Sequence, residues 1–402
     1  MQQFIRQLTG VRFVAAAWVL LYHFQAPLDQ LHLMVPGVHD TVKLGRLGVD
    51  LFFALSGFIL THTYLTKLGP RLSFDGSWRF WWLRLARIYP VHFVMLNVAG
   101  IAAIAQQKVG QAPAGSRGWL NPLDWLKQAL LLQEWGPNPQ RGWNFPAWSL
   151  SMEWLAYLLF PLIVLAVFRF RNRLSTVWLC VIWVGVLVPL LWYGIAYTSD
   201  PYYISGWGST IRVLTEFTAG SITYLIVQRF WEASPGASPQ PRVERLATTL
   251  SVVLPLLVVL GAVVLGHIPA LQWPGSSSDD SLPPKYHLVL VPLLVAWIGV
   301  LALSKRGPSR WLATDKLVLG GYISFSLYMT HTVWYGLWRA GMKVVGINSG
   351  ALYAIGTIGL LAGALVIAWL MWHYVEEPAR EWMRRRVGVR AVAVAEPAGE
   401  LS

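Results

Sequence analysis

Apolar stretches long enough to cross a lipid bilayer recur along the whole chain, separated by short polar connections. The hydrocarbon core of a bilayer is about 30 Å thick, and a helix needs about 20 apolar residues to cross it. The pattern therefore predicts an all-α protein, a polytopic transmembrane helical bundle of about ten spans. The expected spans are 11–27, 46–65, 80–106, 147–168, 176–197, 209–230, 246–266, 287–303, 317–342 and 351–374.

One connection, 107–146, is much longer than the others, rich in Pro and Gly, and contains Trp. Its amphipathic part predicts a short helix from about Pro122 to Gln133, lying at the membrane interface.

Positive charge is divided unevenly between the two sets of connections. Alternate connections hold most of the Lys and Arg residues, at 67–79, 169–173, 229–245, 305–316 and 380–390. Because Lys and Arg accumulate in cytoplasmic loops, both termini are predicted to be cytoplasmic, as an even number of spans requires. We expect one transmembrane domain over 1–380, followed by a basic cytoplasmic tail at 381–402 without a second domain.

Composition supports this assignment and excludes several function classes. Of the 402 residues, 55% are hydrophobic and only 13% are charged, whereas soluble domains have about 25% charged residues. The net charge of +13 does not indicate nucleic-acid binding here, because the apolar stretches make a lipid bilayer the expected partner. The single cysteine, Cys180, excludes an internal disulfide, and the histidines lack metal-ligand spacing, so no metal site is expected. We expect no cleavable signal peptide, because the first apolar stretch contains Arg12 and His23.

Arg12 and His23 are the first candidates for chemistry. They are eleven positions apart on one predicted helix, so both leave the same face, roughly 16 Å apart along its axis. Charged or titratable groups in a membrane span usually line a protein-filled or water-filled cavity. Arg12 is alternatively a helix-end anchor whose guanidinium reaches the membrane surface, and His23 is alternatively a core histidine with satisfied hydrogen bonds.

Glu153 enters the membrane from the opposite side, about five residues into the fourth span, after Trp148-Ser149-Leu150-Ser151-Met152. This depth matches the one expected for His23, so the carboxylate is predicted to partner the imidazole and to favour its protonated form during proton abstraction. A purely structural Glu–His hydrogen bond is the alternative.

Arg84 and Arg87 are three residues apart on one face of the third span. Guanidinium groups bind phosphates through forked, charge-assisted hydrogen bonds. Together with Arg12 they are predicted to form a cytoplasmic phosphate site, although cytoplasmic arginines also follow from the loop-charge rule alone.

Four further polar residues are candidates for substrate binding: Asp50, Ser151, Tyr328 and His331. Asp50 lies in a Gly- and Ser-containing run at the start of the second span, which either permits close helix packing or leaves room for an acyl chain. Tyr328 and His331 share the ninth span with two serines, where helix–helix hydrogen bonding is the alternative role. Glu376, near the end of the last span, is expected to pair with a cytoplasmic arginine, and Pro378 is expected to end that helix.

The order of these motifs resembles the acyltransferase-3 family of integral membrane acyltransferases, over roughly residues 6–380. The matching motifs are Arg12-x10-His23, the Gly45–Phe58 run, Arg84-x-x-Arg87-Ile-Tyr-Pro90, Trp148-Ser-Leu-Ser-x-Glu153, Ser324-Phe-Ser-Leu-Tyr328 with His331, and Glu376-x-Pro378.

The resemblance implies O-acylation, mostly acetylation, of extracytoplasmic carbohydrates such as lipopolysaccharide O-antigen, exopolysaccharide and Nod factor, and in some members of macrolide antibiotics. It implies ten spans in a bacterial inner membrane and acyl-CoA, usually acetyl-CoA, as donor. It also implies that His23 is catalytic and that Arg12 serves the donor. Some relatives carry an additional SGNH hydrolase-like domain, for which this chain is too short, so a second transfer step is expected to need a separate downstream transferase.

The leading hypothesis is therefore acyl transfer from acetyl-CoA, held by Arg12, Arg84 and Arg87, to a carbohydrate or glycosylated acceptor. His23 acts as general base, supported by Glu153, on the acceptor hydroxyl. A serine acyl-enzyme through Ser56, Ser149 or Ser151 is an alternative route. A proton-coupled transporter or flippase is the alternative function, disfavoured because no repeated half and no pair of broken helices is visible.

Overall fold

The computed structural model describes residues 4–108, 120–136, 142–196, 207–233, 239–271 and 286–388. Helices and their connections make up these ranges, and no strand occurs within them, as the all-α prediction requires. The long helices are α1 (Arg6–His23), α4 (Leu47–Leu68), α5 (Phe74–Lys108), α8 (Ala147–Phe170), α9 (Thr176–Ala196), α10 (Trp207–Glu232), α11 (Pro241–His267), α12 (Val291–Leu303), α14 (Asp315–Val344) and α15 (Gly350–Met371).

Each of the ten predicted spans falls on one of these helices. Within the described ranges, six helical segments are long and apolar enough to cross a membrane: Pro36–Leu68, Phe74–Lys108, Ala147–Phe170, Thr176–Ala196, Pro241–His267 and Gly350–Arg386. Helix α12 belongs to a shorter apolar segment, and α1, α10 and α14 carry charged residues that lower their hydropathy. Ten helices are confirmed, whereas ten crossings and the cytoplasmic position of the termini remain predictions.

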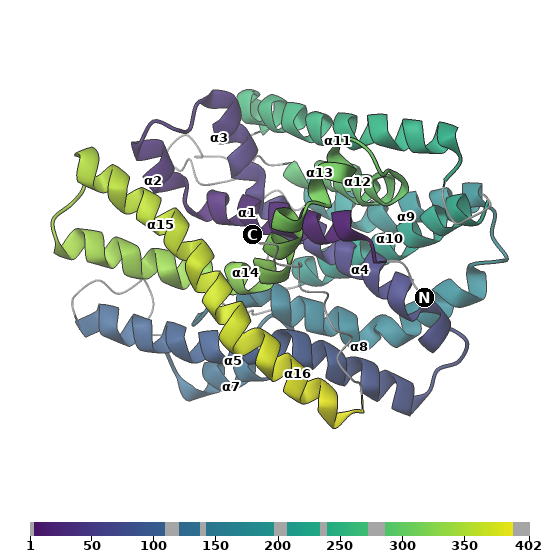
Figure 1. Cartoon of the computed structure of the whole chain (residues 1–402), viewed down its shortest axis with the longest axis horizontal. Helices are drawn as coiled ribbons and strands as arrows, with labels where there is room; N and C mark the ends of the chain where they lie inside the picture. The colour runs from purple at the N-terminus through teal and green to yellow at the C-terminus, as the bar shows by residue number, and fades with distance from the viewer. Residues whose placement is uncertain are drawn as a thin grey trace, which may run out of the picture.

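The helices form an elongated bundle, with α11 along one edge and α5 along the opposite edge (Figure 1). Helix α1 packs against α14 and α4, and α4 packs against α10. The α4–α10 contact is close because a Cβ on Gly57 would lie 1.9 Å from the Phe217 carbonyl oxygen, and a Cβ on Gly220 would lie 2.0 Å from that of Ala54. Glycine permits this backbone approach, so polar residues on α4 and α10 are held in a fixed register.

Short helices connect the long ones. Helices α2 (Gln25–Gln30), α3 (Pro36–Lys43) and η1 (Leu44–Arg46) join α1 to α4. Within the long connection, α7 (Pro122–Ala129) confirms the predicted short helix, although it ends four residues early. Helix α7 begins at an Asn121 cap, whose side-chain oxygen accepts a hydrogen bond from the Asp124 amide at 2.9 Å. Further short elements are η2 (Pro269–Leu271), η4 (His287–Leu290) and α13 (Pro308–Leu312).

The last helix does not end at Pro378. Helix α15 continues through a π-helical segment, η5 (Trp372–Glu376), into α16 (Glu377–Arg386). Pro378 lies in the first turn of α16, where a missing backbone N–H is tolerated. The expected boundary between 380 and 381 therefore falls inside a helix, and residues 389–402 of the predicted tail lie outside the described residues.

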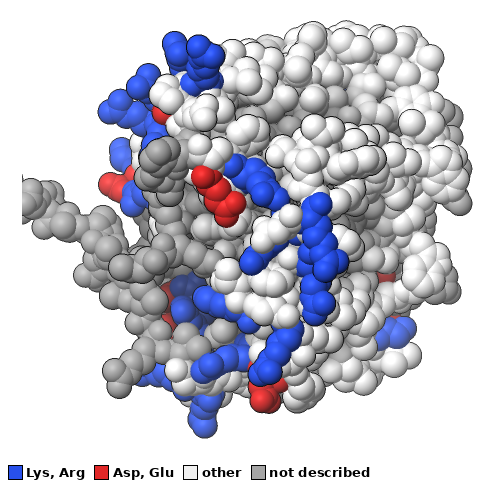
Figure 2. Space-filling model, turned by 90° about the vertical axis from the view of Figure 1, so that its right-hand side faces the viewer, with Lys and Arg blue, Asp and Glu red and all other residues white. Residues whose placement is uncertain are grey.

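Lys and Arg side chains gather on the end of the bundle where α1 begins and where α4 is connected to α5 (Figures 1 and 2). Exposed residues in that connection and in the helix ends beside it include Lys67, Arg71 and Arg79. The uneven charge noted in the sequence is therefore concentrated at one end of the fold.

Candidate active site

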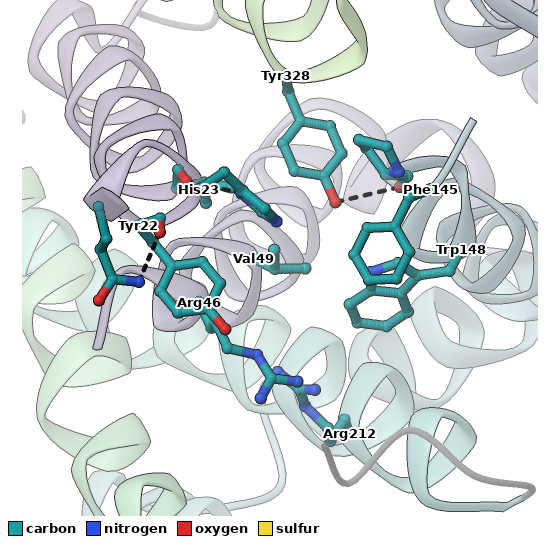
Figure 3. Close-up of a pocket in the computed structure, with 11 residues that line it drawn as sticks. Tyr22, His23, Arg46, Val49, Phe145, Trp148, Arg212 and Tyr328 are labelled. Carbon is teal, nitrogen blue, oxygen red and sulfur yellow. Dashed lines mark hydrogen bonds between the residues drawn. The ribbon is translucent and has the colours of Figure 1, made fainter. Parts of the chain in front are cut away.

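The last residue of α1, His23, lines a cavity of about 260 Å³ between α1, α4, α8, α10 and α14, which we call the histidine cavity (Figure 3). Its other polar and aromatic lining residues are Tyr22, Gln25, Arg46, Phe145, Trp148, Arg212 and Tyr328. Figure 3 shows the imidazole ring projecting from α1 toward Val49, with Tyr328 and Trp148 across the cavity and Arg46 and Arg212 at one end.

Deeper in the bundle, Arg12 lines a smaller cavity of about 50 Å³, which we call the arginine cavity. Its polar lining residues include Ser56, Ser149 and Glu153. Val49 and Tyr328 line both cavities, so the two adjoin one another. The structure thus brings Arg12 and His23 to consecutive cavities along one helix.

His23 contacts a second imidazole. His23 Nδ1 lies 2.9 Å from the Val19 carbonyl oxygen and 3.1 Å from His331 Nε2. His331 is 1% exposed, and its Nδ1 lies 2.7 Å from the Tyr328 carbonyl oxygen. The side chain expected to bind substrate from α14 is therefore a direct neighbour of the expected catalytic group.

The predicted pair between His23 and Glu153 is not formed. The Glu153 carboxylate accepts a hydrogen bond from Ser56 Oγ at 2.9 Å and another from the Tyr157 hydroxyl, and it interacts electrostatically with Arg12. The reason is a difference in depth. The apolar stretch extends to residue 27, but α1 ends at His23. Glu153 lies almost two turns inside α8, near Arg12 in the first half of α1.

The three predicted phosphate-binding arginines do lie together. Arg12 and Arg87 interact electrostatically with one another and with Arg84. The Arg84 guanidinium lies over the rings of Tyr64 and Phe80, at 5.7 and 5.8 Å from their centroids.

Sequence reasoning misses a fourth member, Arg380 on α16, which interacts electrostatically with Arg12 and Arg87. The feature of the sequence that points to Arg380 is its spacing in Glu376-x-Pro378-x-Arg380. The expected helix end at Pro378 hides this feature, because it would place Arg380 outside the bundle. Arg380 pairs with Glu377, and Glu376 pairs with Arg87, which confirms the structural role expected for Glu376. With Glu153, the cluster holds four guanidinium groups and three carboxylates, leaving one net positive charge.

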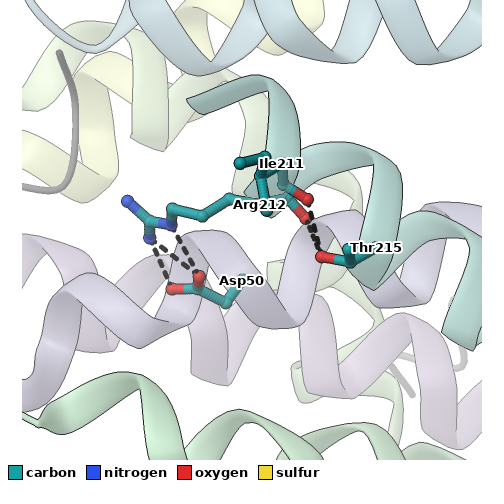
Figure 4. A network of polar contacts seen from close by, with 4 residues as sticks. All are labelled: Asp50, Ile211, Arg212 and Thr215. Atoms are coloured by element: carbon teal, nitrogen blue, oxygen red, sulfur yellow. Dashed lines mark hydrogen bonds and ion pairs between the residues drawn. The ribbon is translucent and has the colours of Figure 1, made fainter. Parts of the chain in front are cut away.

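Asp50 is engaged by a second residue that the sequence does not reveal, Arg212 on α10. Arg212 Nε donates to Asp50 Oδ1 at 3.1 Å, and Nη2 donates to Oδ1 at 2.7 Å and to Oδ2 at 2.8 Å (Figure 4). Both residues are 1% exposed. Arg212, and not Asp50, lines the histidine cavity. Asp50 therefore holds Arg212 in place, whereas the sequence predicts that Asp50 itself contacts the substrate. The feature of the sequence that points to this pair is the presence of Asp50 and Arg212 in two separate apolar spans, where each buried charge requires a partner of opposite charge.

Ser151 lies outside both cavities. Its hydroxyl donates to the Leu131 carbonyl oxygen at 2.6 Å and accepts from the Glu134 amide at 3.4 Å, so it fastens the segment after α7 to α8. Tyr328, in contrast, lines both cavities, and its hydroxyl donates to the Pro146 carbonyl oxygen at 3.1 Å and lies 2.8 Å from Ser149 Oγ.

No group of three or more His, Cys, Asp or Glu residues that could hold a metal ion occurs in the described part of the chain. The imidazole, carboxylate and guanidinium groups that line the two cavities offer proton transfer and anion binding.

Comparison with known proteins agrees with this chemistry. Residues 5–373 match a protein family described as "Acyltransferase domain". The chain is 28% identical to acyltransferase MdmB of Streptomyces mycarofaciens, over 96% of this chain and 94% of that protein. It is 24% identical to peptidoglycan O-acetyltransferase OatA of Listeria monocytogenes, over 94% of this chain and 56% of that protein. It is also 26% identical to exopolysaccharide production protein ExoZ of Rhizobium meliloti, over 87% and 94%. No solved structure matches the chain.

Proposed function

The chain belongs to the acyltransferase-3 family, and on this premise we propose that it transfers an acetyl or other short acyl group from cytoplasmic acyl-CoA to a hydroxyl of an extracytoplasmic carbohydrate or glycosylated acceptor. That the protein is an acyltransferase follows from the family. The names of relatives that act on peptidoglycan or take part in exopolysaccharide production support a carbohydrate acceptor. Family membership also favours an enzyme over the transporter or flippase considered above.

The observation that carries the proposal is the pair of adjoining cavities along α1. Arg12 lines one and His23 the other, and eleven residues of helix separate them by roughly 16 Å. This distance is comparable to the length of a pantetheine arm. A donor anchored by its phosphates near Arg12 therefore brings its thioester close to His23, with Val49 and Tyr328 at the passage between the cavities.

The arginine cluster fits the donor phosphates on two grounds. It has more guanidinium groups than carboxylates, and the Nε atoms of Arg84 and Arg380 are buried without a hydrogen-bond partner among the described residues. A buried donor without a partner is costly, at about 1–3 kcal/mol. Phosphate oxygens supply acceptors for such donors, and charge-assisted hydrogen bonds of this kind are strong.

At the other end, His23 removes the proton of the acceptor hydroxyl while the hydroxyl oxygen forms a bond to the thioester carbonyl carbon. The carbon–sulfur bond then breaks, and the proton passes from His23 to sulfur, which releases CoA as a free thiol. Direct transfer is favoured over an acyl-enzyme because none of the three candidate serines hydrogen-bonds to the His23 imidazole, which contacts His331.

The test uses purified protein in liposomes, acetyl-CoA labelled in the acetyl group, and soluble oligosaccharides prepared from peptidoglycan and from exopolysaccharide. We expect wild-type protein to label an oligosaccharide and His23→Ala to lose at least about 100-fold in rate, since general-base catalysis contributes about 10²–10⁴. His267→Ala is the matched control, because His267 is 57% exposed and pairs with Asp40 at 3.3 Å. Undiminished transfer by His23→Ala would show that His23 is not the general base. Label retained on the protein would favour the acyl-enzyme route.

A further inference from the structure

The ring nitrogens of His23 and His331 have partners that fix their protonation. A backbone carbonyl oxygen accepts hydrogen bonds and cannot donate them. His23 Nδ1 faces the Val19 carbonyl and His331 Nδ1 faces the Tyr328 carbonyl, so both Nδ1 atoms carry a hydrogen. This assignment follows from the hydrogen-bond partners.

In a neutral imidazole, the second nitrogen then holds a lone pair. His331 Nε2 is therefore an acceptor, and the group 3.1 Å from it is His23 Nδ1. The His23 Nδ1 hydrogen is shared between the Val19 carbonyl oxygen and His331 Nε2. The lone pair of His23 is left on Nε2, on a ring that projects into the histidine cavity (Figure 3).

We propose that His331 is the positioning residue for His23: its Nε2 holds the His23 ring in the Nδ1–H form and stabilises the imidazolium that forms during acyl transfer. This inference rests on the proposed function. When the acceptor hydroxyl transfers its proton to His23 Nε2, the ring becomes a cation, and its Nδ1–H bond to His331 becomes charge-assisted and stronger. The same proton later leaves from Nε2 to the thioester sulfur, so His331 neither gains nor loses a hydrogen.

The surroundings of His331 favour this role over simple packing. The residue is buried on α14, the helix that packs along α1, so its ring is held by two helices at once. The Tyr328 carbonyl, one turn earlier on α14, aims the ring through Nδ1. His331 Nε2 is also a neutral acceptor. A carboxylate in its place would bring an additional charge into the buried site, where an unpaired charge is costly.

Two substitutions of His331 separate positioning from bulk. In His331→Asn, the shorter amide side chain reaches only as far as the former place of Nδ1, so this variant retains a donor to the Tyr328 carbonyl and loses the contact with His23. The longer side chain of His331→Gln carries an amide oxygen to the former place of Nε2. We expect kcat to fall about 100-fold in His331→Asn, with an unchanged KM for acetyl-CoA, and to recover to within about tenfold of wild type in His331→Gln.

Thr330→Ala is the matched control, because the buried Thr330 hydroxyl donates to the Ser326 carbonyl oxygen within α14; it should retain wild-type kcat. Wild-type kcat in His331→Asn, or equal loss in both His331 variants, would overturn the inference while leaving the acyltransferase proposal intact. Absence of acyl transfer by the wild-type protein would instead refute the proposed function.

A second measurement reads the protonation of the ring nitrogens in the wild-type protein directly. Solid-state NMR of wild-type protein labelled with ¹⁵N-histidine in liposomes reports which ring nitrogen carries hydrogen, with His23→Ala and His331→Gln spectra used for assignment. Nδ1–H forms for both residues, with a hydrogen-bonded coupling between His23 Nδ1 and His331 Nε2, are expected. An Nε2–H form of His23 would overturn the inference.

Discussion

Replacing Asp50 by Ala removes the partner of a buried cation. The Asp50 carboxylate accepts three hydrogen bonds from Arg212, at 2.7–3.1 Å, and neither residue is more than 1% exposed. In the variant, the Arg212 guanidinium stays in the interior with its Nε and Nη2 donors unpaired. Removing one partner of a buried ion pair typically destabilises a protein by about 3–5 kcal/mol.

The neighbouring residue Glu216 leads us to expect a destabilisation near the lower end of this range for Asp50→Ala. It is fully buried on α10, one turn after Arg212, and interacts electrostatically with Arg212 and Asp50. Its carboxyl group partly compensates the unpaired guanidinium, so we expect Asp50→Ala to lower the free energy of unfolding by about 3 kcal/mol. This is roughly a hundredfold change in the unfolding equilibrium constant.

The assay is equilibrium unfolding of purified protein in mixed micelles of increasing SDS content, followed by the helical circular dichroism signal. Asp315→Ala is the matched control, because Asp315 is 79% exposed in its pair with Arg6; it should change stability by less than about 1 kcal/mol. The double variant Asp50→Leu, Arg212→Met should recover most of the loss, since apolar replacement of a buried pair is often neutral. Wild-type stability in Asp50→Ala, or no recovery in the double variant, would refute the reasoning.

Two further predictions concern helix packing and the donor site. Gly220→Val should lower the free energy of unfolding by about 1–3 kcal/mol because its side chain overlaps the α4 backbone. Gly185→Val is the control and should leave the free energy of unfolding unchanged, because nothing lies within 4 Å of an added Cβ there. Equal effects of the two substitutions would contradict the close α4–α10 contact. Arg380→Gln should raise the dissociation constant of CoA, measured by isothermal titration calorimetry, about tenfold. Arg385→Gln is the control and should leave this constant unchanged, because the Arg385 side chain is 76% exposed. An unaltered affinity in Arg380→Gln would show that Arg380 does not contribute to the donor site.

The sequence predicts the helices well because spacing and hydropathy are local properties. Ten apolar stretches give ten helices, and the 3.6-residue repeat puts Arg12 and His23 along one side of α1. The grouping of Arg12, Arg84 and Arg87 also follows from depth, because all three lie at the same end of their helices.

Pairings between helices depend on information that one helix does not contain. The Glu153–His23 pair fails because the apolar stretch continues past Phe24 while the helix ends at His23. Arg212 escapes notice because an arginine near a helix start resembles a membrane-boundary residue. Arg380 is missed because the π-helical segment and the position of Pro378 in a first turn keep the final helix in contact with the bundle.

Tyr328 and Val49 separate the two cavities, and the Tyr328 hydroxyl is tied to the start of α8 through Pro146 and Ser149. Under the proposed function, the donor comes from one compartment and the acceptor from the other, so transfer must proceed without dissipating the electrochemical gradient between them. An aromatic ring hydrogen-bonded in place interrupts any continuous file of water, so a thioester arm can be admitted without a standing route for protons. Under the proposed function, the side chain that lies beside the path of the thioester arm therefore also limits proton leakage across the membrane.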